Sequence, residues 1–337
     1  MNNYFIFKLN KKPIISIPVG GNLSLTIKAI NCFPDFTTKR KLYKIFMKFF
    51  CVFLHPYFKF FYSNKFICKT YEEWIRLSKL SNSLNNVFIW SPIEERGRFY
   101  IHSFDELGNK LLFTKLTTCL NDFDLIRNEY EFLKYFEKRK KSFKTPSIKS
   151  FEENEHLCYL TVESIPDNYK LFHPEFNKFP IELIKEFQQE KENLTLSAIF
   201  NLNWVKNELN NNYLFSIFKY LKNLQLNTPI ELSVGHGDFG GENIYINNEK
   251  NFMIIDWERG TKFAPILLDK LSFWLGKNHY YLKNNDFHFQ NFLLEFENEN
   301  KYDIALSIIF LVNVNYDLVF ILLNKLNEKN FFDEDKI

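Results

Sequence analysis

The segment Val234–Arg259 has the sequence VGHGDFGGENIYINNEKNFMIIDWER. Its first part is a polar, glycine-containing loop in which the pattern H-G-D-x-x-x-x-N places His236, Asp238 and Asn243. Glycine and polar residues between apolar runs are typical of loops that carry functional side chains. The loop is therefore the first place to look for chemistry in this chain.

A β-hairpin is predicted directly after the loop. Ile244–Ile246 and Phe252–Ile255 are short apolar runs, and the polar pair Asn247-Asn248 between them favours a turn. The return strand ends at Asp256. The hairpin is thus expected to bring a second acid back beside the loop.

These residue types suit phosphoryl transfer from a nucleotide to a hydroxyl group. That reaction needs a carboxylate to orient the hydroxyl and accept its proton, and oxygen ligands for Mg²⁺ on the phosphates. Asp238 suits the first role, and Asn243 and Asp256 suit the second. His236 is interpreted as a packed or hydrogen-bonded loop residue and not as a catalyst.

The motifs HGDFGGEN and IIDWE resemble those of the aminoglycoside phosphotransferase/choline kinase family, a branch of the protein-kinase-like fold. The D-W-E ending, followed by Pro265 and Asp269, is similar to members found in surface-polysaccharide gene clusters. Asp269 is expected to cap or hydrogen-bond the loop, and Glu258 is a second candidate for that structural role.

The resemblance implies an α+β, two-lobed fold with three parts. Residues 1–84 would be a basic N-terminal extension. Residues 85–165 would form a small nucleotide-binding lobe with an antiparallel sheet and one helix, and residues 166–337 a mainly helical catalytic lobe. It also implies ATP and Mg²⁺ as cofactors, and a small-molecule or saccharide hydroxyl as phosphate acceptor.

Several side chains of the small lobe acquire roles through the same resemblance. Lys115 matches the lysine that contacts the nucleotide phosphates, and Glu129 is its preferred partner, with Glu131 as the alternative. Backbone groups near Glu163 and Ile165 would face the adenine. The phosphate-covering loop would be residues 92–97, which contain a single glycine and so depart from the family's glycine-rich pattern.

Apolar periodicity gives a coarse map of the remaining elements. Residues 4–30 are assigned to extended pieces, 173–232 to helices, and the apolar tail 302–326 to one buried helix interrupted by polar residues. The predicted strands and helix of the small lobe are 87–91, 98–103, 110–117, a helix over 122–141, and two strands joined by a turn near 153–154. A polar helix is predicted over 71–84.

The first 70 residues are strongly basic, with twelve Lys or Arg against the single acid Asp35. Because the whole chain carries a net charge of only +3, the remainder is acidic. Thr38 is expected to begin a helix that runs to about Leu54 with a lysine stripe. It would either pack on the body of the protein or, over residues 38–62, lie on an anionic membrane surface. Nucleic-acid binding is not expected, because no recognition motif accompanies the basic charge.

Cysteine usage favours a cytoplasmic protein. The cysteines are odd in number, scattered and without a C-x-x-C pair, which argues for free thiols and against a zinc site. The N-terminus, MNNYFIFKLNKK, does not resemble a signal peptide. The expected location is the cytoplasm, with peripheral membrane contact as an extension. The five cysteines are Cys32, Cys51, Cys68, Cys119 and Cys158.

Three functions remain open from the sequence. A kinase of small-molecule or glycan hydroxyls is favoured, with surface polysaccharide biosynthesis as a possible setting. A pseudokinase that binds nucleotide or acts as a scaffold would explain the glycine-poor loop. A protein kinase has less support, because no A-P-E segment follows Asp256.

Overall fold

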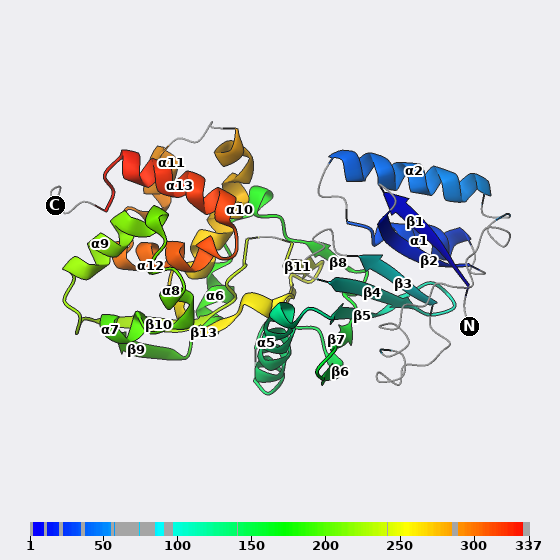
Figure 1. The fold of residues 1–337 in the computed structure, drawn as a ribbon, viewed down its shortest axis with the longest axis horizontal. Coiled ribbons are helices and arrows are strands. Elements are labelled where there is room, and N and C mark those ends of the chain that lie inside the picture. Colours follow the sequence, from blue (N-terminus) through cyan, green and yellow to red (C-terminus); the bar gives the residue numbers. More distant parts are fainter. Residues whose placement is uncertain are drawn as a thin grey trace. The chain divides into compact units, whose positions relative to one another are not determined.

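The computed structural model describes residues 3–9, 12–19, 23–34, 38–54, 57, 74, 85–90, 97–139, 141–240, 242–284 and 289–332. The chain divides into two compact units. The first contains Met1–Glu137 and Pro146–Asp167, and the second contains Lys138–Thr145 and Asn168–Ile337. A large antiparallel sheet with helices in the first unit and a mainly helical second unit confirm the predicted α+β class (Figure 1).

The first unit is built on a seven-stranded sheet of order β1-β2-β3-β4-β5-β7-β6, in which every neighbouring pair is antiparallel. The N-terminal hairpin enters this sheet because Ile15 of β2 pairs with Ile89 of β3. The N-terminal hairpin therefore contributes two strands to the same sheet as residues 85–163. The strands are β1 Asn3–Leu9, β2 Lys12–Val19, β3 Asn85–Trp90, β4 Arg98–Phe104, β5 Lys110–Thr117, β6 Ile148–Glu153 and β7 Cys158–Glu163.

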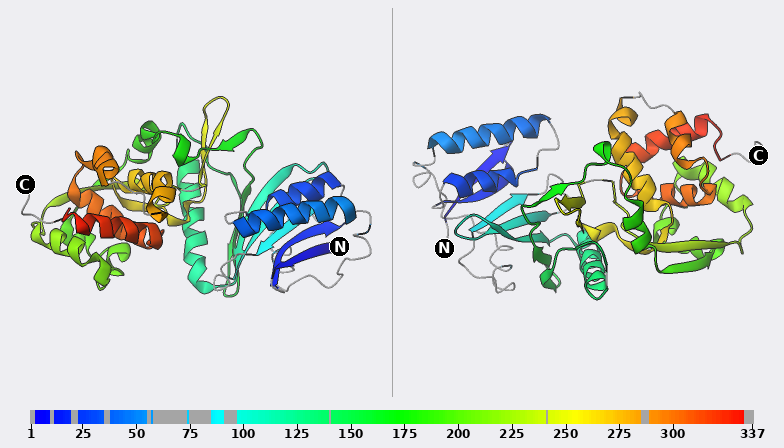
Figure 2. Two further views of the ribbon diagram at one scale, coloured as in Figure 1. Left: turned by 90° about the horizontal axis from the view of Figure 1, so that it is seen from above. Right: turned by 180° about the vertical axis from the view of Figure 1, so that it is seen from behind.

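Helices α1 (Leu23–Asn31) and α2 (Thr38–Leu54) lie together along one side of this sheet (Figure 2). The side chains of β3 identify the face of the sheet that the two helices cover, because successive side chains of a strand point to opposite faces. Val87 and Ile89 pack in the cluster that contains residues of α1 and α2, whereas Phe88 packs in a separate cluster.

The strand predicted at the end of residues 4–30 is wrong, because residues 23–31 form α1. Leu25, Ala29 and Ile30 are buried together on one face of that helix. With Thr26, which is also buried, they recur at spacings of three and four residues, which follow the helical period and not the period of two that a strand needs. The helix predicted over 71–84 lies outside the described residues, apart from Trp74.

The second unit is mainly helical and contains two small three-stranded sheets, β13-β10-β9 and β12-β11-β8. Its helices are α6 Ile181–Phe187, α7 Leu196–Ile199, α8 Asn203–Lys206, α9 Phe215–Asn223, α10 Leu268–Lys283, α11 Phe289–Phe296, α12 Lys301–Val312 and α13 Tyr316–Glu328. Its strands are β8 Tyr169–Leu171, β9 Lys191–Thr195, β10 Pro229–Gly235, β11 Ile244–Asn247, β12 Phe252–Ile254 and β13 Thr261–Pro265.

The all-helical assignment of residues 173–232 needs correction, because it contains β9 and β10. Strand β9 is almost wholly exposed and carries no apolar period. It is a strand because its backbone pairs with β10, from Lys191 opposite Ser233 to Thr195 opposite Pro229. Tertiary pairing of this kind is invisible to local pattern reading.

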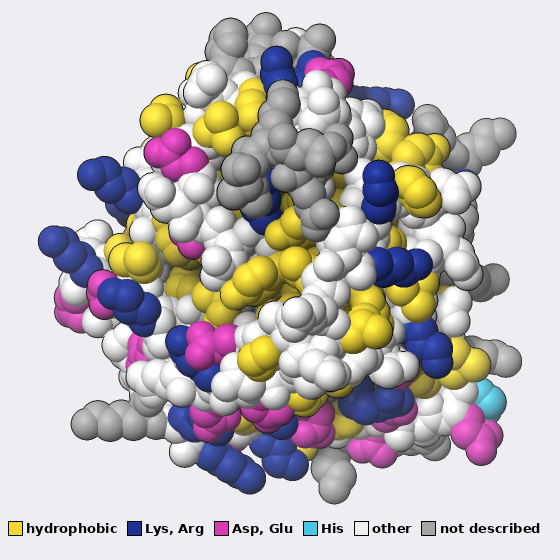
Figure 3. All heavy atoms as spheres, turned by 90° about the vertical axis from the view of Figure 1, so that its left-hand side faces the viewer, with side chains coloured by type: hydrophobic (Ala, Val, Ile, Leu, Met, Phe, Trp, Pro, Cys, Tyr) yellow, Lys and Arg dark blue, Asp and Glu magenta, His cyan; other side chains and the backbone are white. Residues whose placement is uncertain are grey.

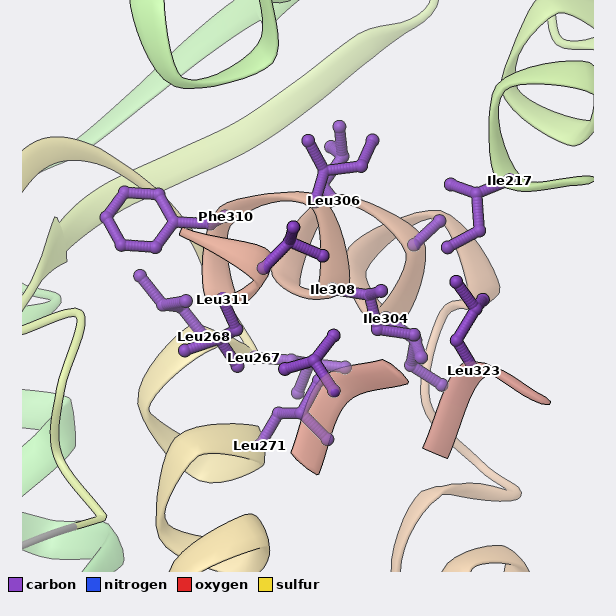
Figure 4. Packing of buried hydrophobic residues seen from close by; sticks show 14 of the residues in the cluster. Ile217, Leu267, Leu268, Leu271, Ile304, Leu306, Ile308, Phe310, Leu311 and Leu323 are labelled. Atoms are coloured by element: carbon purple, nitrogen blue, oxygen red, sulfur yellow. The ribbon is translucent and has the colours of Figure 1, made fainter. Parts of the chain in front are cut away.

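Helix α12 is the centre of the second unit's core. Every residue from Asp303 to Val312 is buried, as expected for a helix that is apolar all round. Figure 4 shows Ile304, Ile308 and Leu311 packed among leucines of neighbouring segments. The apolar tail is thus buried as predicted, but it forms two helices, α12 and α13, instead of one. No helix in the described part of the chain is long and apolar enough to span a membrane.

Helix α10 approaches the loop after β10 so closely that glycine is required on both sides. A Cβ atom on Gly276 would lie 2.0 Å from the carbonyl oxygen of Gly240, and a Cβ on Gly240 would lie 2.0 Å from that of Ser272. Both obstacles are backbone atoms, which cannot rotate away. These glycines let α10 support the loop at van der Waals distance.

Replacement of Gly276 by Ala should therefore destabilise the protein by about 2–3 kcal/mol, the usual cost of overpacking. At an exposed position inside a helix, Gly→Ala stabilises the protein by about 1 kcal/mol. The sign of the change in unfolding free energy therefore shows whether Gly276 is in close contact with the loop. Thermal or urea unfolding of Gly276→Ala measures it, with the exposed Lys283→Ala of the same helix as control. A raised melting temperature for Gly276→Ala would contradict the close approach.

Candidate active site

The loop that follows β10 is fixed by one buried carboxylate. Asp269, in the first turn of α10, accepts hydrogen bonds from the backbone N–H groups of His236 and Gly237, both at 2.9 Å. The predicted role of Asp269 is confirmed. Burial raises the pKa of its carboxyl group to about 6, although the two N–H donors act in the opposite direction.

His236 links the loop to the return strand of the hairpin. Its ring is fully buried, with Nε2 2.8 Å from the carbonyl oxygen of Ile255 and Nδ1 accepting from the backbone N–H of Asp238 at 3.3 Å. This pattern fits a neutral imidazole that carries its proton on Nε2. His236 is therefore the packed, hydrogen-bonded loop residue that the sequence suggested.

Asn243 is bound directly to Asp238. Its Nδ2 donates to the backbone oxygen of Asp238 at 2.8 Å and to Oδ2 of the same residue at 3.3 Å. Because the amide nitrogen is used in this way, the atom left for a cation is the amide oxygen Oδ1. An amide oxygen is a suitable ligand for Mg²⁺.

The predicted hairpin is confirmed as β11 and β12, with Ile244 opposite Ile254. The backbone N–H of Ile255 also donates to the carbonyl oxygen of Asn243 at 3.0 Å. The next residue, Asp256, therefore returns to the loop. Asp256 has φ 62° and ψ 54°, a left-handed conformation that Asp and Asn tolerate better than most residues.

Trp257 holds this return in place. It begins the short 3-10 helix Trp257–Arg259 and is fully buried. Its ring lies 4.5 Å from that of His236 and 5.2 Å from that of Phe187, measured between centroids, and is stacked with Phe143. The sequence reading of D-W-E overlooked this anchor, although a tryptophan beside a polar motif is a usable signal.

A second support was also missed. Lys144 forms a parallel bridge with Met253, its N–H donating to Phe252 at 2.8 Å and its carbonyl accepting from Ile254 at 2.9 Å. Residues 138–145 thus belong structurally with the hairpin, about a hundred residues later in the chain. Nothing in their local sequence indicates a strand partner.

The site concentrates negative charge. Burial, followed by the neighbouring charges of Asp256 and Glu258, raises the pKa of Asp238 to about 6, although Asn243 and Arg259 oppose the shift. Carboxylate oxygens of Asp256 and Glu258 lie within 4.8 Å of each other. Glu258, predicted only as a structural residue, is thus part of the acidic site.

The donor set fits a hard divalent cation. Carboxylate oxygens of Asp256 and Glu258 and the amide oxygen of Asn243 are the ligand types that Mg²⁺ prefers, and a cation would relieve the repulsion that raises the pKa of Asp238. The described side chains around Asp238 therefore suit Mg²⁺ better than a soft metal.

In the first unit, Lys115 of β5 and Glu129 of helix α5 (Leu120–Glu137) form a buried ion pair at 2.7 Å. Glu129 lies on the same face of α5 as the buried Ile126 and Leu133, whereas Glu131 is exposed. Helical spacing thus selects the partner that the sequence favoured. The role of the pair toward a nucleotide remains a prediction.

The backbone groups that were predicted to face an adenine are partly constrained. The N–H of Glu163 donates to the carbonyl oxygen of Ser147 at 2.9 Å, so only its carbonyl could serve an adenine. The carboxylate of Glu163 is exposed and bonds Ser147 and Lys149. Ile165 is half-buried. Residues 92–96 of the predicted phosphate loop lie outside the described residues.

Comparison with known proteins gives structural likenesses alone. No protein-family model matches the chain, and no curated protein matches it. Among solved structures, an ADP-bound aminoglycoside phosphotransferase, APH(2″)-Ib, is 14% identical, with a TM-score of 0.42 and coverage of 80% of this chain and 92% of that one.

Two further solved structures are of the same order of similarity. A putative fructosamine-3-kinase from Haemophilus somnus 129PT has 11% identity and a TM-score of 0.46, covering 77% of this chain and 95% of that one. LicA in complex with AMP has 12% identity and a TM-score of 0.42, covering 78% and 91%. Because identities are this low and the TM-scores are below 0.5, the function of this chain is inferred from its own residues and geometry.

The electrostatics of Asp238 predict that Asp238→Asn is more stable than the wild type in metal-free buffer at pH 7. The raised pKa means that ionisation is less favourable in the folded than in the unfolded chain, whose ordinary value is 3.8. Removal of the charge should gain about 1–2 kcal/mol. Asn can still accept the hydrogen bond from Asn243.

The stability difference between Asp238→Asn and the wild type should depend on pH. The advantage of Asp238→Asn should be full above the folded pKa of about 6, should fall between pH 6 and 3.8, and should vanish below 3.8, where the wild type is protonated in both states. Melting curves in EDTA at several pH values test this, with the exposed Asp317→Asn as control. A variant less stable than the wild type at pH 7 would contradict the analysis.

Proposed function

We propose that this protein is an ATP- and Mg²⁺-dependent phosphotransferase that moves the γ-phosphoryl group to a hydroxyl of a small molecule or glycan. The observation that carries the proposal is the grouping of Asp238, Asn243 and Asp256 at one end of the β11–β12 hairpin. A base with two oxygen ligands beside it is the set that phosphoryl transfer requires. The sequence order of these residues supports the same assignment.

Asp238 is proposed as the catalytic base. A carboxylate whose pKa is raised toward neutrality is a better proton acceptor than an ordinary aspartate, and it can orient the attacking hydroxyl at the same time. Its backbone and side chain are fixed by His236 and Asn243, which limits the cost of positioning. Most of the rate effect would come from this positioning and from electrostatics.

Asn243 and Asp256 are proposed to hold Mg²⁺, with Glu258 as an additional candidate ligand. When bound, the cation neutralises negative charge on the phosphates. The amide oxygen of Asn243 contributes no charge of its own, so the ion would retain attraction for phosphate oxygens. The left-handed backbone at Asp256 sets the direction of its carboxylate.

Lys115 is proposed to contact the phosphates of ATP, with Glu129 as the residue that positions it. A buried lysine needs a charged partner, and Glu129 at 2.7 Å provides it. The carbonyl of Glu163 and the backbone of Ile165 are proposed to contact the adenine. The unit that contains these residues would thus bind the nucleotide.

The acceptor proposed is a saccharide hydroxyl, in surface polysaccharide or a lipid-linked precursor. This rests on the resemblance of the D-W-E segment, and acceptor screening tests it. Action in the cytoplasm is proposed as well, which fits the four described cysteines Cys32, Cys51, Cys119 and Cys158, all of them free thiols.

Binding is tested by thermal melting with and without Mg²⁺ and ATP. At a hundredfold excess over Kd, a ligand that binds only the folded state stabilises it by about 2.7 kcal/mol. That corresponds to a rise of about 5 °C or more for a chain of this size. The rise should be present in the wild type and strongly reduced in Asp256→Asn.

Asp256→Asn is the informative variant because Asn also tolerates a left-handed backbone. Asp256→Asn removes the charge and keeps an oxygen at this position, whereas Asp256→Ala removes the oxygen as well and adds backbone strain. Asp317→Asn, exposed in the same unit, should keep the full rise. An equal rise in the wild type and both Asp256 variants would contradict the metal assignment, and no rise in the wild type would favour a pseudokinase.

Turnover is tested with Asp238→Asn. This variant should retain the Mg²⁺–ATP melting shift and lose phosphoryl transfer by at least about a hundredfold, since general-base contributions are of that size. Transfer from γ-labelled ATP to a panel of sugars and sugar lipids supplies the readout. Wild-type activity in Asp238→Asn would show that another residue is the base.

A further inference from the structure

Helix α2 carries an apolar face that the described residues of the first unit leave exposed. Met47 and Cys51 are fully buried against α1 and the sheet. On the opposite side, six large apolar side chains are 47–72% exposed. They are Leu42, Ile45, Phe46, Phe49, Val52 and Phe53.

These six side chains form one continuous stripe. At 3.6 residues per turn they fall within an arc of about 120°. The lysines and the arginine of the helix lie outside that arc. Soluble proteins rarely expose a contiguous apolar patch of this kind unless it binds a partner or a membrane. We call these six residues the apolar stripe of α2.

Lysines border the stripe on both sides. Lys41 and Lys48 follow one edge and Lys39 lies at the other, at the helical angles next to the outermost apolar residues. The helix contains no acid at all. By contrast, acidic and basic side chains are interspersed on the face of the molecule seen in Figure 3. The charged side chains that α2 itself places beside the stripe therefore have a single sign of charge.

The shape of the apolar stripe and the charge beside it indicate which kind of partner it binds. The stripe is on the convex outer side of a single helix, with apolar residues at its centre and lysines at its edges, as in helices that lie in the plane of a membrane. Lysine stems can extend along apolar surface while the ammonium groups reach lipid phosphates. A second copy of this chain would bring lysine edges against lysine edges, which opposes self-association.

We propose that the apolar stripe of α2 inserts into the interface of an anionic lipid bilayer, with Lys39, Lys41 and Lys48 binding the headgroups. The helix is then a peripheral attachment surface of the first unit. It would place the protein at the membrane, where a lipid-linked acceptor is found. The attachment itself needs no nucleotide and does not depend on the proposed phosphotransfer.

The test is sedimentation of the full chain with lipid vesicles. The wild type should bind phosphatidylcholine vesicles that contain 30% phosphatidylglycerol at least about tenfold more tightly than pure phosphatidylcholine. Binding to the anionic vesicles should weaken as salt is raised from about 0.1 M to 0.5 M, because screening reduces the lysine contribution.

Two paired variants separate the apolar from the charged part. Phe49→Asp/Phe53→Asp should lower affinity at least about tenfold, and Lys41→Glu/Lys48→Glu should do so on anionic vesicles. The matched controls are Leu107→Asp, which is 79% exposed on a turn of the same unit, and Lys219→Glu/Lys222→Glu on the exposed side of α9. Both controls should bind as the wild type does.

Insertion is tested independently by Phe53→Trp, whose emission should shift to shorter wavelength with anionic vesicles and be quenched by brominated lipid. Leu107→Trp should do neither. This readout serves even where a double variant fails to fold, which circular dichroism would show. Absence of wild-type binding, unchanged binding in both paired variants, or a dimer that is dissociated by Phe49→Asp/Phe53→Asp would overturn the proposal.

Discussion

The carboxylate of Asp269 is the constraint on which the candidate site depends. It binds the N–H groups of His236 and Gly237 from the first turn of α10, and so attaches a glycine-containing loop to the rigid core of the second unit. The core supplies that rigidity through α12, which is buried along nearly its whole length. A loop fixed in this way can carry Asp238 in one position.

The same arrangement explains why the site is electrostatically unfavourable without a cation. The hairpin and Trp257 return Asp256 to the loop, where its charge adds to the burial that raises the pKa of Asp238. Trp257 packs against His236 and Phe187 and so fixes this return beside the loop. The proximity of these like charges thus lowers the stability of the folded chain, which is a common property of functional sites.

The first unit buries a charged group, Lys115, which needs a partner of opposite charge. Glu129 lies opposite Lys115 only because α5 turns the face with Ile126 and Leu133 toward the strands. The N-terminal hairpin and α1 extend the same sheet and its cover. With Met47 and Cys51 buried beneath, the apolar stripe of α2 is left on the outside.

The sequence by itself determined the loop, the hairpin, the roles of Asp269 and His236, the pairing of Lys115 with Glu129, and the α+β class. The loop, the hairpin and the roles of Asp269 and His236 follow from local spacing, since a motif is written in consecutive residues. The α+β class and the pairing of Lys115 with Glu129 were expected from the family resemblance that the motifs carry. Only the tertiary structure decided that residues 191–195 form a strand, that Lys144 bridges to the hairpin, and that the N-terminal hairpin joins the main sheet. Each depends on backbone pairing between segments far apart in the chain, and a backbone hydrogen bond leaves no trace in the side-chain pattern of either partner.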